Sequence, residues 1–174
     1  MTQGPRLVPE VGPDTAASLG ELWTAVTRAG GAVGFAADAP DDDIRAAAER
    51  VVGDVQEGRE RLIALGSDDD LLGTVFLRPG PNATRRHRAD VKRLMVHPDL
   101  QGRGWGTALL DAAVAHAMAL GLKQLLLSAR GGTTLPGYYA KLGWTPVGVF
   151  PDALWIGPDD LRDEHWFQLR LQYA

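Results

Sequence analysis

The sequence predicts one α+β domain over residues 1–174, an α/β/α sandwich in which helices flank a mixed, mostly antiparallel sheet. Three observations support this fold class. A length of 174 residues suits a single domain with one core. Apolar residues recur at helical spacing in about four segments and at extended spacing in about seven, without an internal repeat. The central strands read as an antiparallel hairpin meander, and the chain contains one strand–helix–strand unit.

The first half of the chain begins with a short strand and continues with two helices. A strand is expected over Arg6–Val11. Asp14 or Thr15 begins a helix that ends at Gly30 and Gly31. Its apolar stripe has helical spacing and consists of Leu19, Leu22, Trp23 and Val26. A loop covers Gly34–Pro40, and three consecutive acids then begin a second helix at a position where the helix dipole favours negative charge.

The second half alternates strands and helices. Strands are expected over Arg61–Leu65, Leu71–Leu77, Asp90–Val96, Gln124–Ser128, Trp144–Phe150 and His165–Leu171. Helices are expected over Thr107–Leu120 and Thr133–Leu142. Because QLLLS at Gln124–Ser128 is continuously apolar, we expect that strand to be covered on both faces. The segment Pro151–Asp163 is expected to be a long loop between the last two strands.

Composition excludes several classes of protein. The apolar fraction of 45% and the charged fraction of 23% are those of a globular domain, and the net charge of −4 argues against a dedicated nucleic-acid binder. No apolar run approaches the roughly 20 residues needed to cross a bilayer. The segment Met1–Pro13 lacks the pattern of a secretory signal. We therefore expect a cytoplasmic protein without nucleic-acid or membrane partners.

Cysteine and histidine usage bounds the chemistry. The chain has no cysteine, so it has no disulfide, no thiolate nucleophile and no cysteine-built zinc site. The histidines have no metal-ligand spacing, and we expect no metal; they are His87, His97, His116 and His165.

The most informative stretch is Val91–Thr107, VKRLMVHPDLQGRGWGT. A strand ends, and a loop with three alternating glycines runs directly into an amphipathic helix. Glycine allows sharp turns and a close approach of the backbone to a ligand. The free N–H groups of the helix's first turn, together with the helix dipole, make an anion site suited to a phosphate or a diphosphate.

Several phosphate-binding motifs can be compared with this loop. A P-loop is excluded because no Gly-Lys-Ser/Thr is present. A dinucleotide fingerprint fits at Gly102 and Gly104 but fails at Thr107, although Arg130 after the next strand could contact a 2′-phosphate. A plain strand-to-helix turn is the remaining alternative, but it needs fewer glycines.

The pattern Q-x-x-G-x-G at Gln101–Gly106 resembles the GNAT superfamily of acyl-CoA-dependent N-acetyltransferases. The resemblance also includes LMVHPDLQGRGWGTALL, the strand QLLLS, the block YYAKLGW and the order of the elements. Within the superfamily, the chain looks most like the tabtoxin resistance protein group, through GGAVGFAAD, ADVKRLMVHP and LWIGPDDLRDEHWF.

This resemblance implies acetyl-CoA as the cosubstrate and a GNAT-like sheet that is splayed between its fourth and fifth strands. The pantetheine arm would lie in the gap and pair with the backbone of Leu94, Met95 and Val96, a form of strand addition. The diphosphate would rest on backbone N–H groups of the loop, whose residues are Gln101, Gly102, Arg103, Gly104, Trp105, Gly106 and Thr107. The Val96 N–H would hold the oxyanion.

The same resemblance suggests catalytic residues. Tyr139 would be the general acid for the leaving thiolate, and packing against the pantetheine is its alternative role. Tyr138 is expected to be a core aromatic residue. Asp90 would be the general base, directly or through a water chain, and a solvated acid beside Arg88 and Lys92 is the alternative.

Phe35 and Asp38 are the candidate substrate-binding residues, because an aromatic residue near an acid suits a cationic amine. Trp23 is expected to pack in the core. The basic cluster of Arg85, Arg86, His87, Arg88, Lys92 and Arg93 is interpreted as a solvated face.

The expected activity is direct transfer of an acetyl group to the primary amine of a small molecule in a ternary complex. Two alternatives stay open, a protein or peptide N-acetyltransferase and a non-catalytic CoA-binding regulatory module. The predicted loop at Pro151–Asp163 favours a covered site and therefore a small substrate. Folds of this kind commonly form homodimers through their last strands, and we therefore expect that a homodimer is possible.

Overall fold

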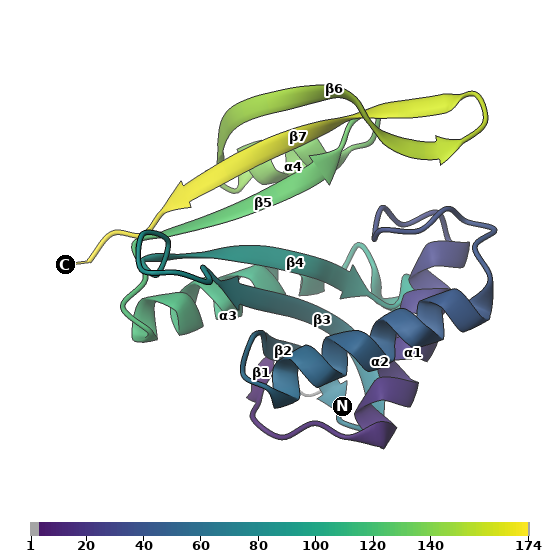
Figure 1. The fold of residues 1–174 in the computed structure, drawn as a ribbon, viewed down its shortest axis with the longest axis horizontal. Helices are drawn as coiled ribbons and strands as arrows, with labels where there is room; N and C mark the ends of the chain where they lie inside the picture. Colours follow the sequence, from purple (N-terminus) through teal and green to yellow (C-terminus); the bar gives the residue numbers. More distant parts are fainter. Residues whose placement is uncertain (1–3, 174) are drawn as a thin grey trace.

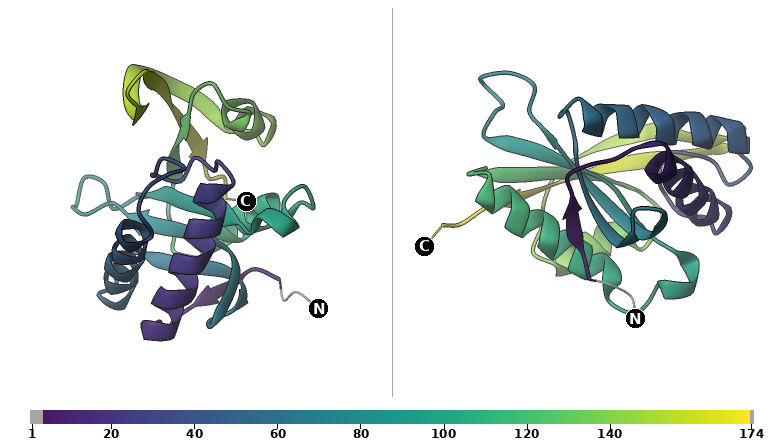
Figure 2. Two further views of the ribbon diagram at one scale, coloured as in Figure 1. Left: turned by 90° about the vertical axis from the view of Figure 1, so that its right-hand side faces the viewer. Right: turned by 90° about the horizontal axis from the view of Figure 1, so that it is seen from below.

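A computed structural model describes residues 4–173 and contains one seven-stranded sheet with helices on both faces (Figures 1 and 2). The strands lie in the order β1-β2-β3-β4-β5-β7-β6. Their bounds are β1 Arg6–Val8, β2 Arg61–Ser67, β3 Asp70–Pro79, β4 Arg88–Val96, β5 Gln124–Arg130, β6 Thr145–Gly157 and β7 Asp160–Arg170. The helices are α1 Pro13–Arg28, α2 Asp41–Gln56, α3 Trp105–Ala119 and α4 Leu135–Lys141, with a short 3₁₀ turn at Pro98–Leu100. The predicted fold class is confirmed.

Two apolar clusters form, one on each face of the sheet. The apolar stripe of α1 and the small and branched residues of α2 pack on the face that includes Phe76 and Met95. The other face packs against α3 and the aromatic residues of α4, with Leu109 and Leu125 fully buried. Pro13 in the first turn and Asp14 behind it suit the start of α1, and three acids suit the start of α2.

β4 and β5 form the one parallel pair of the sheet, and they pair only briefly. Arg88, Ala89 and Asp90 face Gln124, Leu125 and Leu126, and no pairing follows. From Val91 onward the two strands diverge, as the ribbon view shows (Figure 1). The splay that the resemblance implied between the fourth and fifth strands is therefore confirmed.

A β-bulge in β4 accompanies this divergence. Thr74 faces Met95 but Phe76 faces Lys92, so one residue of β3 stands opposite two of β4. Arg93 takes the extra position with φ of 51°, a left-handed conformation that is uncommon for a residue with a side chain. The Thr74 hydroxyl donates to the Arg93 carbonyl at 3.1 Å and so satisfies a backbone group that the bulge releases.

The expectation that β5 is covered on both faces is wrong. Leu125, Leu127 and Ala129 are buried, whereas Leu126 is half-buried and Ser128 is exposed. The physical reason is the splay, because β4 moves away and leaves one face of β5 open.

The long loop predicted over Pro151–Asp163 is also wrong, because β6 and β7 continue through it as an antiparallel ribbon with a tight turn at Pro158 and Asp159. Pro151 is tolerated because β6 is the edge strand of the sheet, where an N–H is not needed for pairing. The register shifts between Phe150 and Leu154, and Asp152 has φ of 52° at this irregularity.

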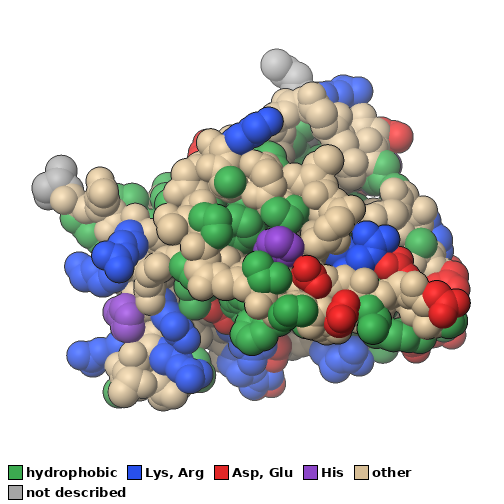
Figure 3. All heavy atoms as spheres, turned by 90° about the horizontal axis from the view of Figure 1, so that it is seen from above, with side chains coloured by type: hydrophobic (Ala, Val, Ile, Leu, Met, Phe, Trp, Pro, Cys, Tyr) green, Lys and Arg blue, Asp and Glu red, His purple; other side chains and the backbone are tan. Residues whose placement is uncertain are grey.

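Much of the surface of the β6–β7 ribbon is exposed to solvent. Hydrophobic side chains gather near the middle of the face that carries it (Figure 3). Val147, Val149 and Phe150 of β6 are exposed. β6 is one of the two edge strands of the sheet, and the homodimer stays a prediction. Within residues 4–173, the helices are too short or too polar to cross a membrane.

Candidate functional site

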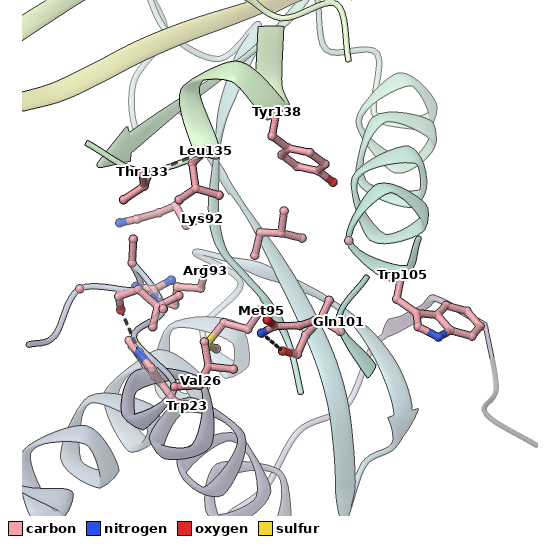
Figure 4. A pocket seen from close by; sticks show the side chains of 18 of the residues that line it. Trp23, Val26, Lys92, Arg93, Met95, Gln101, Trp105, Thr133, Leu135 and Tyr138 are labelled. Carbon is pink, nitrogen blue, oxygen red and sulfur yellow. Dashed lines mark hydrogen bonds between the residues drawn. The ribbon is translucent and has the colours of Figure 1, made fainter. Parts of the chain in front are cut away.

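A cleft of about 1050 Å³ opens where β4 and β5 separate. Its walls come from β4, β5, α1, α4, the connection between α1 and α2, and the glycine-rich loop before α3. We call the part formed by Gln101, Gly102, Gly104–Thr107 and Tyr138 the α3 end. The part formed by Trp23, residues 29–35, Lys92 and Arg93 is the α1 end. Figure 4 shows Trp23, Lys92 and Arg93 on one side of the cleft, and Gln101, Trp105 and Tyr138 lie on the other side.

The α3 end has the geometry of an anion site. Gly102 and Gly104 have φ of 73° and 83°, and a Cβ at either position would meet no atom within 4 Å. Gly104 caps α3, and its carbonyl accepts the first helical hydrogen bond from the Ala108 N–H at 3.0 Å. The N–H groups before Ala108 have no partner within the helix and can bind a diphosphate.

Gln101 fixes the loop to the end of β4. Its Nε2 donates to the Val96 carbonyl at 3.0 Å. The His97 N–H donates to the Leu72 carbonyl of β3 at 2.8 Å. Because backbone groups alternate in direction along a strand, the Val96 N–H faces away from β3 and toward the gap.

Two neighbouring tyrosines of α4 contribute to the cleft in different ways. Tyr139 is buried and its ring packs against Trp144 and Phe167. Burial, and secondarily Tyr138, raises the pKa of the Tyr139 hydroxyl well above its usual range. The Tyr138 hydroxyl lies 3.1 Å from the Thr107 Oγ1 and points toward the start of α3 (Figure 4). Tyr138 is therefore more than the core aromatic residue that was expected.

The α1 end is walled by aromatic rings. Trp23 is buried as expected, and its Nε1 donates to the Val33 carbonyl at 2.9 Å. Phe35 meets the Trp23 ring edge to face, with 5.5 Å between the ring centroids. These contacts hold the loop that follows α1 against the cleft.

A buried ion pair lies behind this wall. Glu60 has no exposed surface, and its carboxylate accepts from the Arg93 guanidinium at 2.8 Å and from Arg78 at 3.3 Å. The Arg93 guanidinium also lies over the rings of Trp23 and Phe76, at 5.7 Å and 5.3 Å from their centroids. Lys92 is half-buried in the cleft beside Arg93.

The structure brings most of the predicted site residues together. Leu94, Met95, Val96, Phe35, Tyr139 and the loop residues except Arg103 line one cleft. Arg103 and Asp38 are exposed and lie outside its lining. Asp90 occupies the last paired position between β4 and β5, also outside the lining.

Glu60 was not predicted from the sequence, and the interpretation of Lys92 and Arg93 as part of a solvated face is wrong. The basic cluster is exposed only at Arg85, Arg86 and His87, whereas Lys92 and Arg93 face the cleft. Their position on the strand rather than the loop was the available signal. Glu60 stands between two arginines at the start of a strand and gives no sign of burial in the sequence. In residues 4–173, no group of three acidic or histidine side chains could hold a metal ion.

Comparison with known proteins agrees with this geometry. A curated relative, the mycothiol acetyltransferase of Geodermatophilus obscurus, is 36% identical over 90 residues. That match covers 50% of this chain and 29% of the relative, so the chain spans less than a third of that protein.

Solved structures share the fold at low sequence identity. An N-acetyltransferase from Staphylococcus aureus Mu50 superposes with a TM-score of 0.77 at 14% identity, covering 99% of each chain. The Salmonella typhimurium protein yncA, solved with its cofactor acetyl-CoA, superposes with a TM-score of 0.74 at 17% identity, covering 100% of this chain and 96% of that one. None of these relatives is described as a tabtoxin resistance protein, so that subgroup stays a prediction.

The sequence model of the Acetyltransferase (GNAT) family matches residues 22–144, which include α2, the splayed strands, the glycine-rich loop and both tyrosines of α4. The chain therefore belongs to the GNAT family of acetyltransferases.

Proposed function

We propose that this protein transfers the acetyl group of acetyl-CoA directly to the primary amine of a small molecule. The observation that carries this proposal is the separation of β4 from β5 after three residue pairs. The separation opens one cleft between the two strands, with the α3 end on one side and the α1 end on the other. A coenzyme bound at the α3 end and an acceptor bound at the α1 end can therefore come into contact between β4 and β5.

The coenzyme would occupy the α3 end. Free backbone N–H groups at the start of α3 would hold its diphosphate. The amides of the pantetheine arm would pair with β4 at Leu94, which has no partner strand on the β5 side, whereas the backbone of Met95 pairs with Thr74 of β3 and only its side chain would contact the arm. The Val96 N–H, which faces the gap, would stabilise the oxyanion of the tetrahedral intermediate.

The lack of cysteine supports direct transfer. Because the chain has no thiolate to carry the acetyl group, we propose that the amine attacks the thioester while both ligands are bound. The nitrogen–carbon bond forms, the carbon–sulfur bond breaks, and CoA leaves as a thiolate that takes up a proton.

Tyr139 is the proposed donor to that sulfur, and its buried hydroxyl stays protonated because burial raises its pKa. The raised pKa also makes Tyr139 a weaker acid. Tyr138 is therefore the second candidate for the proton donor, because its hydroxyl faces the α3 end. Asp90 is proposed to receive the amine proton through a water chain, since it shares a strand face with Lys92.

The test is release of free thiol from acetyl-CoA in the presence of an amine library. Tyr139→Phe should lower turnover by about 10²- to 10⁴-fold and leave acetyl-CoA affinity within about twofold of the parent value. Tyr138→Phe is the matched variant. If only Tyr138→Phe depresses turnover, the donor is Tyr138, and an unchanged rate in both variants removes tyrosine from the reaction.

Two other functions give different results in the same experiments. Saturable acetyl-CoA binding without thiol release across the library would identify a CoA-binding regulatory module. Acetylation of peptides in preference to small amines would identify a protein acetyltransferase. The predicted loop over Pro151–Asp163 no longer argues against a peptide, because that segment is part of the β6–β7 ribbon.

A further inference from the structure

The side chains that line the cleft carry positive charge and no negative charge. In the described part of the chain, the charged lining residues are Lys92 and Arg93, and no aspartate or glutamate is among them. The lining therefore offers no carboxylate to pair with a cationic amine. The lining instead suits a ligand that brings an anion.

The charge of Arg93 is neutralised by an ion pair within the protein. Its guanidinium donates to the fully buried Glu60 carboxylate at 2.8 Å and is covered by two aromatic rings. The side chain of Arg93 is 17% exposed. Arg93 therefore forms the floor of the α1 end and is compensated by Glu60.

The charge of Lys92, in contrast, is not neutralised by an ion pair in the described part of the chain. Within residues 4–173, the Lys92 ammonium forms no ion pair and donates no hydrogen bond. Burial and, next, the charge of Arg93 lower the pKa of the Lys92 ammonium, and the opposing effects of Glu60 and Asp90 are smaller. A partly desolvated ammonium without a partner is unfavourable, and an anion at this position would remove much of the penalty.

The position of Lys92 separates it from the coenzyme. Lys92 follows Val91, where β4 leaves β5, and stands opposite Phe76 before the bulge. Figure 4 shows its nitrogen directed away from Gln101 and Trp105, on the same side of the cleft as Arg93 and Trp23. An anion bound there belongs to the acceptor and not to the diphosphate at the α3 end.

We infer that the acceptor carries an anionic group next to its amine, a carboxylate or a phosphorus oxyanion, and that Lys92 binds this group. The acceptor class is thus an amino acid or a similar small amino acid analogue. The anion would fix the amine at a set distance from the thioester. The identity of the bound molecule as an acetyl acceptor rests on the proposed function. The anion site itself rests only on the residues that line the cleft.

The experiment compares matched acceptors. The protein amino acids, their carboxamides and the corresponding aminoalkylphosphonates are offered with acetyl-CoA, and thiol release gives kcat/KM for each. The free acids or the phosphonates should be preferred even though the carboxamides have the less basic and more often neutral amine. The ranking of acids against phosphonates identifies which anion the site takes.

Variants of Lys92 supply the second arm. Lys92→Gln should lower kcat/KM for the preferred acid by about 10- to 100-fold and for its carboxamide by no more than about threefold, and Lys92→Arg should restore part of the loss. The control is Lys123→Gln, which removes the same charge from an exposed lysine outside the cleft and should leave both values unchanged. An equal loss for acid and carboxamide in Lys92→Gln overturns the inference, as does a preference of the parent protein for carboxamides.

Calorimetry separates this inference from the proposed function. The acids and phosphonates are titrated into protein saturated with CoA, which cannot transfer an acetyl group. Binding that is lost in Lys92→Gln but kept in Lys123→Gln supports the anion site even if no thiol is ever released, in which case only the proposed transfer fails. Binding of none of these anions overturns the anion site even if neutral amines are acetylated.

Discussion

Glu60 is a carboxylate with no exposed surface, and its two cationic partners are Arg78 of β3 and Arg93 of β4. Replacing it with glutamine leaves the Arg93 guanidinium buried without a counter-charge. Breaking a buried pair from one side is strongly destabilising, so Glu60→Gln should lower the free energy of unfolding by about 3 kcal/mol. Urea denaturation of the two proteins measures the difference.

A neighbouring glutamate provides the control for this prediction. Glu57 is exposed and pairs with Arg59 at the surface. Glu57→Gln should therefore change the free energy of unfolding by no more than about 0.5 kcal/mol. Equal effects of the two substitutions would show that the pair behind the cleft contributes no more than a surface contact.

His116 should make the protein sensitive to mild acid. Burial, and then the charge of Arg61, lowers the pKa of the His116 imidazole from 6.5, and its buried Nε2 has no hydrogen-bond partner among residues 4–173. The unfolded chain therefore binds more protons at this residue than the folded protein does, so stability falls as pH drops through 6.5 toward the lower folded pKa. The free energy of unfolding should be lower at about pH 5.5 than at about pH 7.5, and the difference should be smaller in His116→Gln. His87→Gln, in an exposed loop, should keep the parent's difference.

The charged residues of the site could be read from the sequence only in part. The strand over Asp90–Val96 was predicted, but the sequence could not show that the bulge at Arg93 would bring a guanidinium onto Trp23 and Glu60. Burial of a charge depends on partners that are distant in the chain, and Glu60 and Arg93 are separated by 33 positions. The alternation that governs a regular strand fails at a bulge.

At the scale of elements, the loop before α3 gives a test of ligand binding that is separate from stability. Gly104 has φ of 83°, and an added Cβ would meet open space in the cleft. Gly104→Ala should cost about 1 kcal/mol of folding free energy, because alanine disfavours this conformation. The added methyl group would stand where the diphosphate approaches, so calorimetry should show acetyl-CoA affinity reduced by about tenfold or more.

The opposite end of the same helix carries the control. Gly121 follows α3 with φ of 74° and also has no atom within 4 Å of an added Cβ, but it lies outside the cleft. Gly121→Ala should therefore cost a similar amount of stability and leave acetyl-CoA affinity unchanged. Equal losses of affinity in the two variants would mean that the loop acts through α3 as a whole and not through contact.

Most elements were predicted from local signals, and the failures share one cause. Helices with glycine or proline at their ends, such as α1 and α3, begin and end close to their predicted residues. The strands over Trp144–Phe150 and His165–Leu171 were predicted, but their continuation as a ribbon was missed because Pro151 and Asp152 suggest a loop. Only the position of β6 at the sheet edge makes these two residues acceptable in a strand. An edge is a property of the whole sheet and cannot be read from one segment.

At the scale of the molecule, the sheet consists of two parts that share a short seam. β1–β4 form one part and β5–β7 the other, and three residue pairs of β4 and β5 join their backbones. Beyond that seam, the backbone groups of β4 that face the gap have no strand to pair with. Such a region should open locally more often than the rest of the sheet.

A coenzyme that lies between the two parts should therefore change their dynamics unevenly. Acetyl-CoA should slow amide hydrogen exchange at Leu94 and Val96 and at the first turn of α3, because its amides and diphosphate would supply the missing partners. Exchange in β1 and β2 should respond less, since those strands are already paired and lie away from the cleft. The measurement compares amide hydrogen exchange rates with and without acetyl-CoA at each of these positions. Uniform slowing across the sheet would indicate general stabilisation by a ligand bound elsewhere, whereas slowing confined to the gap and the helix start would place the coenzyme between the diverging strands.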